Sequence, residues 1–235
     1  MLKIAIVGAT GIVGQQAIVS LIGHPWFKIE KLVASERSAG KKYIDALKDP
    51  NGSSRWWCKE QLPLDIANMS VEDAASFDAT SVDIIFSTMD AGAAKELEPK
   101  YAKTTPVIST ASAFRYEEDT PILVGGVNMD HAPLLAVQQK NRGWKGFVSP
   151  KPNCTIAGLV VSLKPLQDSF GVKQVVMVSQ QAMSGAGRTP GLSAMDMTEN
   201  IVPYIPGEEP KVESEPQKIL GKFTGKTIQN AAFGI

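Results

Sequence analysis

Short apolar runs and helix-spaced apolar positions alternate along the first part of the chain. Residues 2–7 form a continuous run of mostly branched apolar side chains that ends at a glycine. Such a run is typical of a strand buried on both faces of a parallel sheet. Residues 12–22 carry apolar side chains at helical spacing, and residues 29–34 form a second strand-like run. This order predicts an α/β protein that opens with a Rossmann-type, doubly wound parallel sheet.

The same alternation returns further along the chain. Residues 83–86 and 106–108 are predicted strands, with a helix over residues 91–102 between them. We expect the sheet to continue to roughly residue 125. Residues 41–64 are instead rich in turn-forming residues, so no regular element is predicted for them and a surface excursion is expected.

The pattern changes after Pro150. A helix is predicted to open at Cys154, followed by a strand-like run over residues 172–180 and then a glycine-rich loop. We therefore predict a nucleotide-binding domain over residues 1–150 and a second domain, of the α+β class, over residues 151–235.

The charge of the chain is balanced, with 24 Lys and Arg against 24 Asp and Glu. No excess charge favours nucleic acid or an anionic membrane as a partner, so a small molecule is expected. The N-terminal apolar run of about five residues is too short for a signal peptide or a membrane span, and a cytoplasmic location is expected. The two cysteines, Cys58 and Cys154, form neither a disulfide pattern nor a metal-site spacing.

Three glycines, Gly8, Gly11 and Gly14, lie between the first predicted strand and its helix. Glycine permits a tight turn and lets backbone N–H groups approach a pyrophosphate at the positive end of a helix. The place of this motif, after a strand and before an amphipathic helix, favours dinucleotide binding over a plain structural turn.

The end of the second predicted strand indicates which dinucleotide is bound. NAD usually requires a carboxylate there for the ribose 2′-hydroxyl, whereas NADP requires a cation and hydroxyl groups for the 2′-phosphate. Arg37 can contact a phosphate through two hydrogen bonds, and Ser35 and Ser38 can donate to it. Glu36 leaves NAD open, and an ordinary solvated loop is the other reading. NADP is the predicted cofactor.

Cys154 follows Asn153 at the predicted start of a helix. The helix dipole and the free N–H groups at such a position favour the thiolate, which is the nucleophilic form of cysteine. The amide of Asn153 is suited to orienting an oxyanion. A small buried cysteine is the alternative reading. Cys58, beside tryptophans in the irregular segment, is expected to be structural.

Four segments carry a family resemblance. They are GATGIVG at residues 8–14, PNCT at 152–155, SQQAMSGAGRTPG at 179–191 and NIVPYIPGEEPKVESEPQKILG at 200–221. Together they resemble aspartate-semialdehyde dehydrogenase, most closely the archaeal and fungal type. The resemblance covers essentially the whole chain in the family's order.

The resemblance implies roles for the matching residues. Cys154 would take the aspartyl group from aspartyl phosphate, and Gln181 would position the substrate beside it. Arg115 matches the position that binds the substrate phosphate, although a surface salt bridge is an equal reading from the residues alone. The implied NADP contacts are Thr10, Gly11, Ile12, Val13, Arg37, Ser38, Ser184 and Gly185, and the implied substrate-side charges are Glu208, Glu209 and Lys211. Without the resemblance, the three charges would read as a solvated cluster.

The implied activity is an NADPH-dependent oxidoreduction in lysine, threonine and methionine biosynthesis. L-Aspartyl 4-phosphate would become aspartate semialdehyde and phosphate through a thioester on Cys154. The family forms dimers, so a homodimer or homotetramer is expected, and no metal is implied.

The family also uses an acid/base histidine and a substrate-binding arginine that have no match here. His24 and His131 do not stand in the order of the family's histidine and are expected to be structural or surface residues. The chain closes on the apolar stretch AAFGI. We expect the second domain to be incomplete and the 235-residue chain to be poorly active or inactive by itself.

Three other readings stay open. Malonyl-CoA reductase shares the fold, the cysteine and the glycine loop, although Asn153 favours the aspartyl enzyme. N-Acetyl-glutamyl-phosphate reductase is a related chemistry with a poorer match around Cys154. From a different class, the chain can be a catalytically empty module that binds NADP or dimerises.

Overall fold

The structure, a computed structural model, describes residues 1–186 and 197–235. The chain divides into two compact units. The first unit comprises residues 1–121 and 132–151, and the second comprises residues 122–131 and 152–235.

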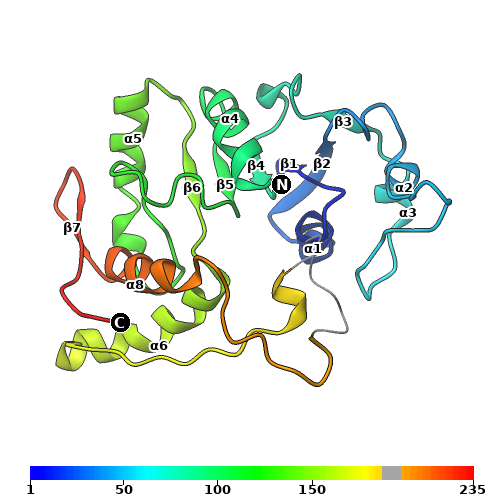
Figure 1. Ribbon diagram of the computed structural model, residues 1–235. Helices are drawn as coiled ribbons and strands as arrows, with labels where there is room; N and C mark the ends of the chain where they lie inside the picture. Colours follow the sequence, from blue (N-terminus) through cyan, green and yellow to red (C-terminus); the bar gives the residue numbers. More distant parts are fainter. Residues whose placement is uncertain (187–196) are drawn as a thin grey trace. The chain divides into compact units, whose positions relative to one another are not determined.

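The first unit is built on a six-stranded parallel sheet with the order β3-β2-β1-β4-β5-β6 (Figure 1). The strands are β1 (Leu2–Val7), β2 (Phe27–Ala34), β3 (Val71–Asp73), β4 (Ile84–Ser87), β5 (Val107–Ser109) and β6 (Val148–Pro150). The helices are α1 (Ile12–Leu21), α2 (Tyr43–Ala46), α3 (Leu64–Ala67), the 3₁₀ helix η1 (Ala79–Ser81), α4 (Ala91–Ala102) and α5 (Leu134–Arg142). In this strand order, ligands bind beyond the carboxyl ends of the strands where the order reverses, which here is between β1 and β4.

Both faces of the sheet are covered. Val7 of β1 belongs to a buried cluster with Leu97 and Tyr101 of α4. Its neighbour Ile6 belongs to a second buried cluster, with Ile18 of α1. Because successive strand residues point to opposite faces, a strand covered on both sides needs apolar residues throughout, and this explains the continuous apolar run of β1.

The predicted strands and helices of the first hundred residues are confirmed, with ends that differ by no more than two residues. The predicted end of the sheet near residue 125 is wrong, because the last strand, β6, comes after α5 and spans residues 148–150. A strand of three residues is too short to show a hydrophobic period of its own.

The expected surface excursion over residues 41–64 is only partly exposed. It includes α2, and both Tyr43 and Leu47 are buried in the same cluster as Ile6. A four-residue helix does not complete enough turns for its buried face to be read from the sequence. The segment therefore contributes to the core of the first unit.

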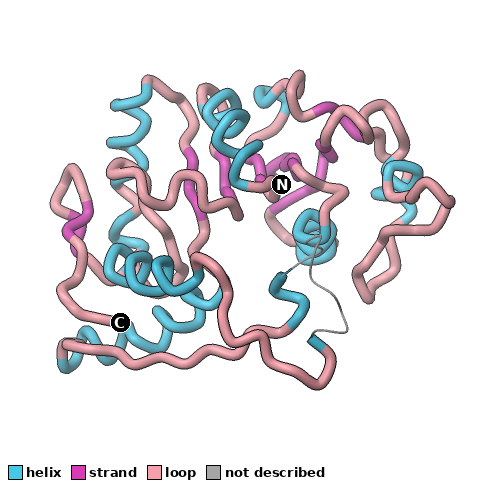
Figure 2. Tube along the Cα trace, in the orientation of Figure 1, coloured by secondary structure: helices cyan, strands magenta, loops and turns pink. Residues whose placement is uncertain are grey.

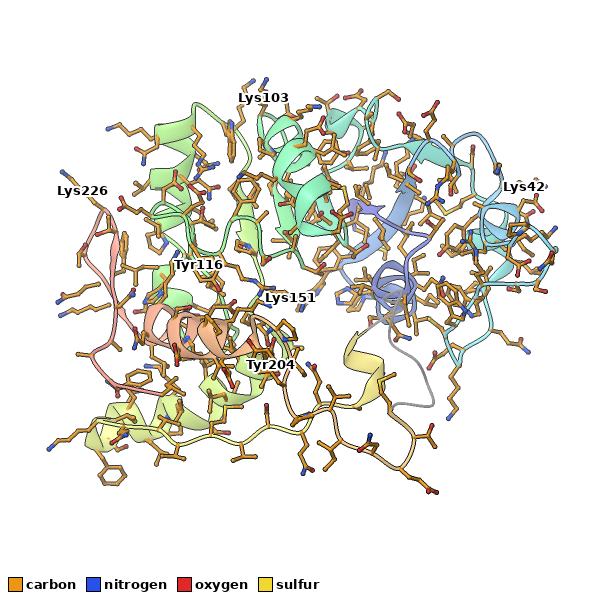
Figure 3. All side chains as sticks on the ribbon, in the orientation of Figure 1. Lys42, Lys103, Tyr116, Lys151, Tyr204 and Lys226 are labelled. Carbon is orange, nitrogen blue, oxygen red and sulfur yellow. The ribbon has the colours of Figure 1, made fainter. Side chains whose placement is uncertain are left out.

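The second unit is centred on two helices. Its elements are η2 (Met129–His131), α6 (Cys154–Phe170), η3 (Met183–Ala186), α8 (Glu208–Ile219), β7 (Lys222–Phe223) and β8 (Ile228–Gln229). Ile156 and Val160 of α6 share a buried cluster with Ile219 of α8. Lys226 lies at the turn of the antiparallel hairpin formed by β7 and β8 (Figure 3). None of the helices in the described residues is long and apolar enough to cross a membrane.

The predicted strand over residues 172–180 is wrong. Figure 2 shows this run as loop, and its one pairing among the described residues is an isolated bridge from Gln174 to Gly234. Val176 and Val178 are each 90% exposed. Branched residues favour an extended backbone, but a strand persists only where a neighbouring strand satisfies its backbone hydrogen bonds.

Candidate functional site

The glycine loop that joins β1 to α1 forms a tight turn held by the backbone. The N–H of Gly8 donates to the carbonyl of Val33 at 2.9 Å, and the N–H of Gly11 donates to the carbonyl of Gly8 at 3.0 Å. Gly8 has a φ of +85°, which disfavours any residue with a side chain. A Cβ on Gly14 would lie 2.4 Å from the carbonyl oxygen of Gly8, so α1 can approach the loop this closely only with glycine there.

The start of α1 leaves backbone donors open. Among the described residues, the N–H groups of Thr10, Ile12 and Val13 donate no hydrogen bond. Gly11, the N-cap residue, has room for close approach, because a Cβ there would meet only the Gly8 carbonyl at 3.4 Å. Open donors at the positive end of a helix, beside a residue without a side chain, fit a pyrophosphate group.

The residues predicted to contact the 2′-phosphate, in the turn after β2, differ in their exposure. Ser35 and Arg37 are exposed, whereas Ser38 is buried and its N–H donates to the Ser35 carbonyl at 2.8 Å. Glu36 is also exposed. Arg37 thus extends into solvent at the carboxyl end of β2, where a cation can meet an incoming phosphate. The contact itself stays a prediction.

The second unit brings the predicted nucleophile and two predicted partners together. Cys154 is the first residue of α6, and its side chain is exposed. The Oδ1 of Asn153 caps the helix by accepting from the N–H of Thr155 at 2.8 Å. The Nε2 of Gln181 donates to the Sγ of Cys154 at 3.5 Å. The alternative of a small buried cysteine does not describe this exposed side chain.

Gly185 controls the position of Gln181. A Cβ on Gly185 would lie 2.8 Å from the Cγ of Gln181, so a side chain there would displace Gln181. Ser184, in the same 3₁₀ helix, is exposed. The part of the glycine-rich loop over residues 187–191 lies outside the described residues.

The charged residues of α8 contact the start of α6. Glu208 accepts from the Nδ2 of Asn153 and from the Oγ1 of Thr155, each at 3.2 Å. The Nζ of Lys211 lies 3.8 Å from Glu208. Glu209 is exposed. Asn153 therefore acts as a helix cap with one amide proton held by Glu208, and its oxyanion role stays a prediction.

Glu215 is a contact that sequence analysis missed. Its side chain is buried, and its Oε2 accepts from the backbone N–H of Asn153 at 2.8 Å. The sequence signal is a glutamate placed four residues before Ile219, which puts both on the inward face of α8. Two carboxylates of α8 thus hold the residue that precedes the predicted nucleophile.

Arg115 is more enclosed than the anion-binding prediction implied. The residue is buried, its Nε donates to the carbonyl of Lys151 at 2.9 Å, and its NH2 group donates to the carbonyl of Thr110 at 3.1 Å. These bonds fix the guanidinium among the loops that follow β5 and β6. The phosphate contact stays a prediction.

The two histidines and Cys58 have local structural contacts. His24 lies in the turn after α1, not on the helix, and stacks on Phe27 with ring centroids 4.8 Å apart. His131 is buried, with its Nε2 3.1 Å from the carbonyl oxygen of Gly221. Burial raises the pKa of Cys58, so its thiol keeps its proton near neutral pH. No group of acidic, histidine and cysteine side chains in the described residues is arranged to hold a metal.

Two family models match the chain. Residues 3–134 match "Semialdehyde dehydrogenase, NAD binding domain", and residues 163–234 match "Semialdehyde dehydrogenase, dimerisation domain". Because the first match alone covers more than half of the chain, the chain belongs to the semialdehyde dehydrogenase family. Within that family it resembles the aspartate-semialdehyde dehydrogenases of the archaeal and fungal type.

Curated relatives support this placement. The chain is 46% identical to the aspartate-semialdehyde dehydrogenase of Archaeoglobus fulgidus over 97% of its own length and 64% of the relative's. It is 44% identical to that of Schizosaccharomyces pombe over 93% of its own length and 60% of the relative's. The chain thus spans less than two-thirds of the length of these relatives.

Two solved structures of aspartate-semialdehyde dehydrogenases are also similar to the chain. The crystal structure of aspartate-semialdehyde dehydrogenase with NADP from Candida albicans matches with a TM-score of 0.85 and 36% identity, over all of this chain and 65% of that one. A structure from Vibrio cholerae, complexed with ASA, matches with a TM-score of 0.61 and 28% identity, over 80% of this chain and 48% of that one.

Proposed function

We propose that this chain carries the cofactor loop and the nucleophile of an NADP-dependent aspartate-semialdehyde dehydrogenase. The reaction is the conversion of L-aspartyl 4-phosphate into aspartate semialdehyde and phosphate. The observation that carries the proposal is the exposed Sγ of Cys154 at the first residue of α6, within reach of the Gln181 amide. The relatives to which this chain is 46% and 44% identical bear the name of that enzyme.

The cofactor would be held by the first unit. The open N–H groups of Thr10, Ile12 and Val13 suit its pyrophosphate, and exposed Arg37 suits its 2′-phosphate. The related Candida structure contains NADP, which favours NADP over NAD despite the exposed Glu36. When bound, NADPH supplies the hydride for the reduction.

The chemistry at Cys154 is acyl transfer followed by reduction. The thiolate Sγ attacks the acyl carbon, a C–S bond forms, and phosphate leaves with the electrons of the C–O bond. Hydride then adds to the thioester carbonyl carbon. The C–S bond breaks, the aldehyde is released, and the electrons of that bond return to sulfur as thiolate. Gln181, donating toward Sγ, orients the acyl group beside it.

Assembly is the third part of the proposal. The second unit matches a dimerisation family model over residues 163–234, and it exposes large apolar side chains. Phe170 is 85% exposed, and Tyr204, labelled in Figure 3, is 57% exposed. We expect self-association into a homodimer or homotetramer, and light scattering of the purified chain would show masses above that of one 25.2 kDa chain.

The acyl-transfer step can be tested without turnover. The purified chain is incubated with aspartyl phosphate in the absence of NADPH, digested at low pH, and examined by mass spectrometry. We expect one aspartyl group on the peptide that contains Cys154, none in Cys154→Ser, and unchanged labelling in Cys58→Ser. Labelling by malonyl-CoA in place of aspartyl phosphate would assign the chain to the related reductase. Labelling with neither would contradict the proposal.

A further inference from the structure

The segment over residues 42–63 is attached to the glycine loop of the first unit. The hydroxyl of Tyr43 donates to the carbonyl of Ala9 at 2.7 Å, across 34 positions of sequence. Tyr43 is fully buried, and so is Ala9. In Figure 1 the segment carries the label α2 and leads into the helix labelled α3.

Gln15, in the first turn of α1, makes a second attachment. Its Nε2 donates to the carbonyl of Thr10 at 3.2 Å and to the carbonyl of Arg55 at 2.8 Å. Its Oε1 accepts from the N–H of Trp57 at 2.8 Å. The side chain is fully buried, and its amide links the loop to the far part of the segment.

These two bonds end on the carbonyls of Ala9 and Thr10, the two residues between Gly8 and Gly11. A trans peptide is planar, with its C=O and N–H pointing in opposite directions. A carbonyl held toward the protein therefore turns the N–H of the same peptide away from it. The bond from Tyr43 thus orients the N–H of Thr10, which donates no hydrogen bond among the described residues.

The peptide between Thr10 and Gly11 follows the same rule. Gln15 holds its carbonyl, and its N–H donates to Gly8 at 3.0 Å, which closes the turn. Both peptide planes of the loop are therefore set by side chains from outside the glycine motif. A loop whose donors are oriented before binding loses less conformational entropy when a pyrophosphate arrives.

We infer that Tyr43 and Gln15 are positioning residues for the cofactor, and that residues 42–63 form a brace that orients the glycine loop toward the pyrophosphate. The inference rests on the proposed NADP binding. It gives a role to a segment that the glycine motif itself does not include.

The brace is also held together by contacts among its own residues. The guanidinium of Arg55 donates to the carbonyl of Ala46 at 3.1 Å, and the backbone N–H of Arg55 donates to the carbonyl of Leu47 at 2.8 Å. The ring of Trp56 meets that of Tyr43 edge-on, with centroids 6.5 Å apart. Burial raises the pKa of Tyr43, so its hydroxyl keeps the proton that it donates at physiological pH.

The test compares two ligands and four variants of the full chain. NADP contains the pyrophosphate, whereas adenosine 2′-monophosphate carries the 2′-phosphate and the adenosine without it. Tyr43→Phe and Gln15→Met remove the two bonds to the loop. Tyr101→Phe and Gln138→Met are matched controls. Tyr101 is also buried and donates its hydroxyl to a backbone carbonyl, that of Ala74.

Gln138 matches Gln15 because it is fully buried and its amide both donates to and accepts from the backbone of Val148. Both control pairs lie away from the glycine loop in the chain. The dissociation constant for each ligand and the melting temperature without ligand are measured for all variants.

We expect Tyr43→Phe and Gln15→Met to weaken NADP binding by about 5- to 10-fold each, as for the loss of one net hydrogen bond. Binding of adenosine 2′-monophosphate should change by less than about 2-fold. The controls should lower the melting temperature without changing the ratio of the two dissociation constants.

Equal ratios for Tyr43→Phe and Tyr101→Phe, with normal NADP binding by the unaltered chain, would overturn this inference alone. Failure of the unaltered chain to bind NADP would overturn it together with the cofactor assignment. Tyr43→Phe removes a single oxygen atom, so it decides the matter even where Gln15→Met does not fold.

Discussion

The chain contains two helix starts with candidate functions, and they differ in what they offer. At the start of α1, the N-cap is a glycine without a side chain, and the N–H groups of Thr10, Ile12 and Val13 have no acceptor among the described residues. At the start of α6, the cap is filled by the Asn153 side chain. One helix end leaves its backbone donors for a ligand, whereas the other satisfies a donor internally.

The difference fits the two proposed roles. A pyrophosphate is bound by several N–H groups, so side chains that compete for them are excluded from the first site. A nucleophile needs one exposed atom in a fixed position, and the proposed nucleophile, Cys154, lies at a helix end held by Glu208 and Glu215 of α8. A site that binds through backbone N–H groups thus favours an open helix N-terminus, whereas a site that reacts through a side chain favours a capped one.

The largest expected effect comes from the reacting atom. Cys154→Ser replaces a thiol by a hydroxyl that does not ionise near neutral pH, so acylation by aspartyl phosphate should fall at least ~10³-fold. The rate of peptide labelling by mass spectrometry measures it. The melting temperature should stay the same, because the side chain is exposed. A labelling rate equal to that of the unaltered chain would show that Cys154 is not the nucleophile.

Two glycine substitutions test the N-terminal end of α1. Gly14→Ala places a Cβ 2.4 Å from the Gly8 carbonyl oxygen, and should destabilise the first unit by about 1–3 kcal/mol and abolish NADP binding. Gly11→Ala meets that oxygen at 3.4 Å, so the fold should be kept while NADP binding weakens. Calorimetry with and without NADP separates the two. Similar melting temperatures for both variants would show that the glycines are interchangeable.

Asn153→Ala examines the second helix end. Removing the cap leaves the N–H of Thr155 without its acceptor, and a lost cap costs about 1 kcal/mol. Denaturant unfolding measures the loss. Asp90→Ala is the matched control, because Asp90 caps α4 in the same way by accepting from Gly92 at 2.9 Å. A large loss for Asp90→Ala and none for Asn153→Ala would contradict a filled cap at α6.

The last expected effect is a pH dependence of stability, which comes from the buried carboxyl of Glu98 in α4. Burial raises the pKa of Glu98, against the hydroxyls of Ser109 and Ser87, which lower it. The folded chain then keeps this proton where the unfolded chain has lost it, so stability from this group is complete below the unfolded pKa and declines as pH rises toward the folded one.

Glu98→Gln removes that titration. We expect it to match the unaltered chain near pH 4 and to exceed it by about 1 kcal/mol near pH 8, since a permanently neutral amide can replace the buried carboxyl. Unfolding curves at the two pH values measure it. A stability difference that is the same at both values would show that Glu98 does not titrate on unfolding.

Much of the first unit could be predicted from the sequence. The strand β1, the helices α1 and α4 and the glycine motif were found because apolar period and glycine spacing are properties of neighbouring residues. The helix that begins at Cys154 was found for the same reason. The predicted strand over residues 172–180 failed because apolar composition does not supply a partner strand.

The sequence by itself determined the class of fold, the glycine loop and the cysteine at a helix start, since each is written in a few consecutive residues. Only the tertiary structure decided that Tyr43 holds the Ala9 carbonyl and that Glu215 holds the Asn153 N–H, 62 positions away. Such pairs leave no local period, because a buried hydrogen bond depends on where two distant segments meet and not on the residues that surround each partner in the chain.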